Sequence, residues 1–89
     1  MKNYIGMYVQ IMFRSTEQVT SYYIGKVKEQ FEDSLVLEPF ESDDSWVDWS
    51  KLPEQSKQVV LMYKVKQEVE VFIKNIVSIS LLPKSGGYL

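Results

Sequence analysis

The fold is decided by residues 71–81, which read Val71-Phe72-Ile73-Lys74-Asn75-Ile76-Val77-Ser78-Ile79-Ser80-Leu81. β-Branched and aromatic side chains dominate both sides of the pair Lys74-Asn75, and such side chains are typical of strands. The polar pair interrupts this apolar pattern and indicates a turn. We therefore predict two strands joined at Lys74-Asn75, the second of which runs from Ile76 to Leu82 and is stopped by Pro83.

The first of these two strands is predicted to be the longest in the chain, from Val59 to Ile73. Its second half alternates apolar residues with Lys and Glu, as a half-buried strand does, whereas Val59–Tyr63 is apolar on both faces. A strand of this length outruns the strands before it. We therefore expect part of it to pair elsewhere or to form an exposed apolar edge, which natural proteins cover with another chain.

Three shorter extended runs precede this strand. Met7–Arg14 alternates apolar and polar side chains, Val19–Gln30 is rich in β-branched and aromatic residues, and Leu35–Phe40 is a short apolar run. The connections at residues 15–18 and 32–34 are too short to hold crossover helices. These runs therefore predict an antiparallel meander.

Gly25 lies in the middle of the second run. A missing side chain permits the sharp coiling needed at a barrel corner, and it equally permits the close approach of a neighbour. The sequence leaves both interpretations open. The predicted fold class is all-β: a single domain over residues 1–89 that forms a small, five-stranded, strongly bent antiparallel barrel of the SH3-like kind.

Composition narrows the chemistry that such a domain can perform. The chain has 89 residues, 45% of them hydrophobic, and contains neither His nor Cys. The commonest general base, the commonest metal ligand and the thiol nucleophile are therefore missing. We predict that the protein is not an enzyme and that it has no catalytic residue, no cofactor and no metal site.

Charge is segregated along the chain. Residues 38–54 hold six acidic residues and one Lys, which leaves nine basic and six acidic residues for the rest. The acidic residues lack the full spacing of a calcium loop, so a solvated acidic loop is favoured over a cation site. The positive excess elsewhere is compatible with one basic face, although lysines on strands also serve solubility and edge protection.

Residues 41–58 are predicted to form a variable acidic loop, in which Pro53-Glu54 can start a helical turn. Trp46 and Trp49 either fold back to anchor this loop, which is the favoured interpretation, or contribute to an interface. A tail at residues 83–89 is predicted to be mobile. No stretch approaches the roughly 20 apolar residues of a membrane span, so we expect a cytoplasmic protein without membrane contact.

Two motifs resemble the Sm/LSm family of RNA-binding proteins. The second motif of that family runs from aliphatic or aromatic residues through Arg-Gly-Asn into a hydrophobic strand that ends near Leu-Pro, and residues 71–83 follow this outline. Gly25-Lys26-Val27 and Phe31–Leu37 are similar to the first motif. The chain departs from the pattern because Lys74 replaces the usual Arg, the Gly is absent, and Ser34 stands nearest the base-reading Asn.

The resemblance implies an Sm-like barrel with little or no N-terminal helix, in which the fourth strand of one subunit pairs with the fifth strand of the next. Such pairing closes a homo-oligomeric ring of roughly five to seven copies. The resemblance also implies that the turns after the second and fourth strands bind single-stranded RNA or DNA. The implied contact residues are Phe31, Asp33, Ser34, Lys74 and Asn75.

Physical chemistry gives each of these residues a possible role. Phe31 can stack on a base, Ser34 and Asn75 can read a base edge, and Lys74 can hold a phosphate. The alternative is that Phe31 belongs to the core and that Lys74-Asn75 is merely a turn. Two hypotheses of function follow: an Sm-like ring that binds single-stranded nucleic acid in processing or as a chaperone, or an SH3-like module that mediates protein assembly through Trp46, Trp49 and the acidic loop.

Overall fold

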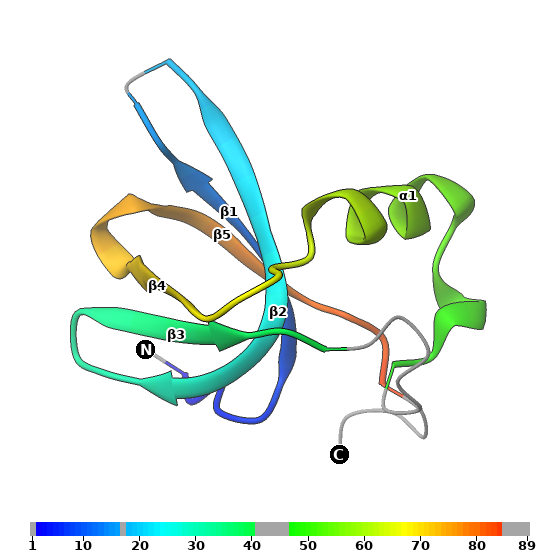
Figure 1. The fold of residues 1–89 in the computed structure, drawn as a ribbon, viewed down its shortest axis with the longest axis horizontal. Coiled ribbons are helices and arrows are strands. Elements are labelled where there is room, and N and C mark those ends of the chain that lie inside the picture. The colour runs from blue at the N-terminus through cyan, green and yellow to red at the C-terminus, as the bar shows by residue number, and fades with distance from the viewer. Residues whose placement is uncertain (1, 17, 41–46, 85–89) are drawn as a thin grey trace.

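Five strands form one antiparallel sheet in the computed structural model, which describes residues 2–16, 18–40 and 47–84 (Figure 1). Their order across the sheet is β4-β3-β2-β1-β5. The strands are β1 (Tyr8–Arg14), β2 (Thr20–Gln30), β3 (Ser34–Glu38), β4 (Val69–Phe72) and β5 (Ile76–Leu81). The described residues also form two short 3-10 helices, η1 (Trp49–Lys51) and η2 (Ile73–Asn75), and one α-helix, α1 (Glu54–Tyr63). The expected antiparallel five-stranded architecture is confirmed.

The connectivity of the sheet requires it to curve. β4 and β5 lie at opposite edges of the sheet, yet only the three residues of η2 join them. Four strand spacings in a flat sheet amount to roughly 19 Å. The link from Phe72 to Ile76 spans about 14 Å at most when extended. The edges therefore curl toward each other, and Figure 1 shows the pronounced bend of β2 that accompanies this curvature.

Gly25 on β2 lies where another part of the chain comes close. A Cβ atom at this position would lie 3.0 Å from the carbonyl oxygen of Glu38 and 3.0 Å from Cγ2 of Val65. The backbone N–H of Val65 donates to the carbonyl of Ile24 at 2.8 Å, which holds the segment before β4 against β2. Gly25 therefore admits a close neighbour on a strand that also bends.

Two hydrophobic clusters lie on the two sides of the sheet, because successive side chains of a strand point to opposite faces. Val9 and Tyr8 on β1 accordingly belong to different clusters. The first cluster contains Val9, Ile11, Val27, Leu35, Leu37, Val65 and Val71. The second cluster contains Tyr8, Ile24, Phe40, Val47, Val60 and Leu82. Both faces of β1 and β2 are thus covered, the second by the region around α1.

The prediction of one long strand from Val59 to Ile73 is wrong. Its first part is helical, because α1 continues to Tyr63, and β4 has only four residues. Val60 is fully buried in the second cluster. Leu61 and Met62 are 53% and 69% exposed. The excess length that suggested pairing with another chain is therefore absent.

The predicted acidic loop contains regular structure in its described part. η1 is capped by Asp48, whose carboxylate Oδ1 accepts from the Ser50 hydroxyl at 2.5 Å. This hydrogen bond lowers the pKa of Asp48. Trp49 stacks on Phe40 with ring centroids 6.5 Å apart, which confirms the anchoring interpretation for this residue. Trp46 lies outside the described residues.

The two ends of the described chain differ from regular strands. Met7 N–H donates to the Tyr4 carbonyl at 2.9 Å across a turn at Gly6, and residues 2–7 contain no helix. Lys84 forms an isolated bridge with Val47, and residues 85–89 of the predicted mobile tail lie outside the described residues. Within the described parts of the chain, no helix is long and apolar enough to cross a membrane.

Candidate functional site

The structure places the two turns named in the sequence analysis side by side. The backbone N–H of Ile73 donates to the carbonyl of Asp33 at 2.8 Å, and Ser34 pairs with Phe72 in the register of β3 and β4. The β2–β3 turn therefore touches η2, the link between β4 and β5. Residues separated by about forty positions in the sequence meet at one end of the curved sheet.

Phe31 begins the β2–β3 turn and is presented to solvent. Its backbone N–H donates to the Ser34 carbonyl at 2.8 Å, which closes the turn. The Phe31 side chain is 52% exposed and belongs to neither core cluster. The interpretation of Phe31 as a core residue is therefore excluded, and its ring is accessible for stacking.

Ser34 has a different position. The residue is only 3% exposed, and its hydroxyl donates to Oε2 of Glu70 on β4 at 2.7 Å. A base contact by this hydroxyl requires that the hydrogen bond to Glu70 be broken. In this structure the Ser34 hydroxyl instead links β3 to β4 next to the turn, so Ser34 helps to fix the position of the turn relative to β4.

Three adjoining hollows surround η2, and we call their combined lining the η2 surface. The first, of about 430 Å³, is lined by Arg14, Ser15, Thr16, Lys74, Asn75, Ile76 and Val77. The second, of about 570 Å³, is lined by Glu32, Asp33, Phe72, Ile73 and Lys74. The third adds Phe13, Tyr23, Glu70 and Val71 to residues shared with the other two. Lys74 belongs to both larger hollows, so it lies at their junction.

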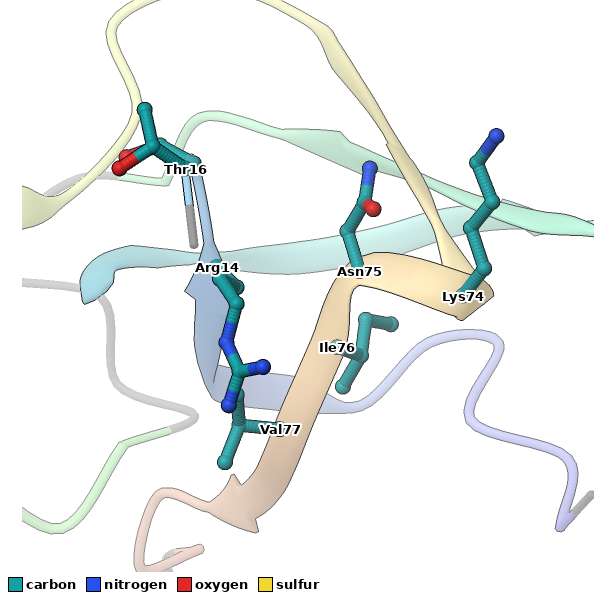
Figure 2. A pocket seen from close by; sticks show the side chains of 7 residues that line it. Arg14, Thr16, Lys74, Asn75, Ile76 and Val77 are labelled. Carbon is teal, nitrogen blue, oxygen red and sulfur yellow. The ribbon is translucent and has the colours of Figure 1, made fainter. Parts of the chain in front are cut away.

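The first hollow is formed by η2 and the β1–β2 hairpin. Figure 2 shows the side chains of Asn75 and Lys74 projecting to one side of η2, while the Arg14 side chain extends toward Val77 on β5. Arg14 reaches this place because β5 pairs with β1, with Phe13 opposite Ile76. Arg14 was not among the residues predicted for the site. The register between the first and last strands is the signal that would have found it.

The two cations of the η2 surface, Arg14 and Lys74, are not neutralised by ion pairs with described residues. Neither Arg14 nor Lys74 forms an ion pair with a described residue, whereas Lys28 pairs with Glu68 at 2.5 Å. That pairing, through the Glu68 hydrogen bond and charge, raises the pKa of Lys28. Phe72 is 46% exposed beside Lys74. The surface thus combines two cations that form no ion pair with a described residue, an amide and the half-exposed ring of Phe72 with the carboxylates of the β2–β3 turn.

Comparison with known proteins assigns no family: no protein-family model, no curated protein and no solved structure matches the chain. Among the described residues, no group of three or more acidic side chains is placed to hold a metal ion.

Proposed function

We propose that the protein is a small Sm-like barrel that binds single-stranded nucleic acid, RNA in the first place, at the η2 surface. The observation that carries the proposal is that Lys74 and Asn75 line one hollow together with Arg14, the only Arg in the chain, around one three-residue turn. Arg and Lys attract phosphates, and Arg also stacks on bases. An amide group can read a base edge.

The exposed aromatic rings support a single strand as the ligand. Phe31 and Phe72 are both about half exposed at this end of the sheet. Unpaired bases stack on aromatic side chains, and each such contact contributes about 1–3 kcal/mol of binding free energy. Bases in a duplex are already stacked on each other. The η2 surface is therefore better suited to a single strand than to a double helix.

The proposal includes a homo-oligomeric ring of roughly five to seven copies, in the cytoplasm. Support comes from the two sheet edges: among the described residues, no strand pairs with the outer side of β4 or of β5. Two such edges on one molecule fit head-to-tail strand pairing between copies. A ring repeats each weak site around one axis and so increases avidity.

Fluorescence anisotropy with short single-stranded oligonucleotides tests the binding. We expect affinity to fall as salt rises, because binding to phosphates releases counterions. Phe72→Ala should weaken binding about tenfold through lost stacking. Lys74→Ala should reduce the slope of log K against log salt by about one unit.

Lys66→Ala is the matched control for Lys74→Ala, because Lys66 is exposed and lines none of the hollows around η2. It removes the same charge from a different place. Equal effects of Lys66→Ala and Lys74→Ala would show that binding follows net charge only. Absence of any salt-dependent binding by the unmodified protein would contradict the proposed function.

A second candidate is protein assembly by an SH3-like module, which the exposed Leu61 and Met62 of α1 favour. This surface differs from the Trp-containing loop first considered for that role, because Trp49 packs on Phe40. Exposed apolar side chains on a helix are typical of partner contacts when they form a patch. Under this hypothesis Leu61→Ser and Met62→Ser abolish the interaction, while Lys74→Ala leaves it intact.

A further inference from the structure

The two larger hollows of the η2 surface differ in charge, and Lys74 separates them. The hollow on the β1–β2 hairpin side is lined by Arg14, hydroxyl groups and an amide, and none of its described lining residues carries a carboxylate. The hollow on the β2–β3 side is lined by Glu32, Asp33 and the half-exposed Phe72. A strand crossing η2 therefore meets two different chemical environments.

The hairpin side suits the phosphate of a nucleotide. Arg14 presents a planar fork of N–H donors that matches phosphate oxygens, and it has no ionic partner among the described residues. Lys74 supplies positive charge at the other end of the same hollow. The carboxylates across Lys74 repel phosphates. The backbone of a bound strand is therefore directed to the Arg14 side.

The other side then receives the base. Phe72 offers a face for stacking, and the carboxylate of Asp33 accepts hydrogen bonds but cannot donate them when ionised. Guanine carries two neighbouring donors on its Watson–Crick edge, N1–H and N2–H, which match the two oxygens of a carboxylate. Adenine and cytosine offer one amino group each, and the single N–H of uracil lies between two carbonyl groups that a carboxylate repels.

We propose that the η2 surface recognises a guanine nucleotide within a single strand, with its phosphate at Arg14 and its base between Phe72 and the Asp33 carboxylate. This inference rests on the proposed function and adds a base preference to it. The backbone of Asp33 is fixed by the hydrogen bond from Ile73, and the neighbouring Ser34 is held by Glu70. The carboxylate is therefore carried on a turn whose position relative to Phe72 is defined.

Short uridine oligonucleotides that carry a single guanine, inosine or adenine at one position test the preference by anisotropy. The base of inosine, hypoxanthine, differs from guanine only in lacking the N2 amino group. We expect guanine to bind about tenfold more tightly than inosine or adenine, as one bidentate contact provides. Failure of every oligonucleotide to bind would overturn the proposed function itself. Equal binding of all of them would overturn the guanine inference and leave the proposed function standing.

Two variants separate the contribution of the phosphate contact from that of the base contact. Asp33→Asn should abolish the guanine preference without weakening the binding of adenine-containing oligonucleotides, because the lost carboxylate also repels phosphates, and Arg14→Gln should weaken binding of all of them and keep the preference. Glu54→Gln, on the opposite side of the molecule at the start of α1, is the control for Asp33→Asn (Figure 1). Persistence of the preference in Asp33→Asn, or its loss in Glu32→Gln instead, would overturn the assignment to Asp33.

Discussion

At the scale of single residues, Gly25 shows how a missing side chain determines local packing. Its position would place a Cβ atom at 3.0 Å from the backbone oxygen of Glu38, a group that cannot rotate away. The neighbouring Ile24 accepts the hydrogen bond from Val65 that ties the segment before β4 to β2. An added methyl group therefore pushes β2 away from the path that leads into β4.

Gly25→Ala should accordingly lower the free energy of unfolding by about 1–3 kcal/mol, the cost of overpacking. Urea denaturation followed by circular dichroism measures this loss. Ser78→Ala on the exposed part of β5 is the control and should change stability by less than about 0.5 kcal/mol. If the Gly25→Ala protein is as stable as the unmodified one, Val65 can shift away from β2 without loss of unfolding free energy, which would contradict this account of Gly25.

The residues of the site were predictable to different degrees. Lys74 and Asn75 were found from the break in an apolar pattern, which is a local signal. The burial of Ser34 was not predictable, because it depends on Glu70 lying opposite in the β3–β4 register. Arg14 was missed for the same kind of reason: it comes to line this hollow because the preceding Phe13 pairs with Ile76 of the last strand.

At the scale of elements, α1 is the segment whose conformation the sequence pattern concealed. Val59–Tyr63 is apolar at every position, so neither the period of a strand nor that of a helix stands out. Pro53 and Glu54 did indicate a helical start, and α1 does begin at Glu54. Tertiary packing decides between strand and helix here, because the helix beside β2 buries Val60 in the second hydrophobic cluster.

Substitutions at Val60 and Met62 distinguish the two conformations. In a strand these residues share one face and would be equally buried, whereas in α1 only Val60 is buried. Val60→Ala should therefore cost about 2 kcal/mol of unfolding free energy. Met62→Ala should be nearly neutral, since Ala is a good helix former.

Thermal denaturation of both variants measures the difference, with a fall of about 4–8 °C in Tm for each kcal/mol in a domain of this size. Similar losses from Val60→Ala and Met62→Ala would contradict the helical assignment. A loss from Met62→Ala alone would indicate that this exposed side chain is covered by another molecule.

At the scale of the whole molecule, the proposed ring concerns the two edges of the sheet. The long strand that first suggested a ring is absent, so the expectation of a ring now depends on the outer edges of β4 and β5. In such a ring the number of copies would be set by the angle between neighbouring subunits. The general course of the sheet was predictable from the sequence, but this angle was not.

Native mass measurement over a range of protein concentrations tests the ring, with an expected assembly of roughly five to seven copies. Val77→Asp puts a charge on exposed β5 and should disrupt assembly, whereas Leu61→Asp on α1 should not. A concentration-independent monomer would contradict the ring. Disruption by Leu61→Asp alone would locate the contact on α1 and favour the assembly module.

The pairing of β1 with β5 also has a consequence for how the chain is made. β1 lies beside residues that leave the ribosome more than sixty positions later. Until then its edge has open hydrogen-bonding groups next to the buried side chains of Val9 and Ile11, a combination that favours aggregation. Non-local pairing of this kind is slow to form. Synthesis of the last strand is therefore the event that completes the sheet. Translation interrupted before Ile76 would leave an aggregation-prone fragment.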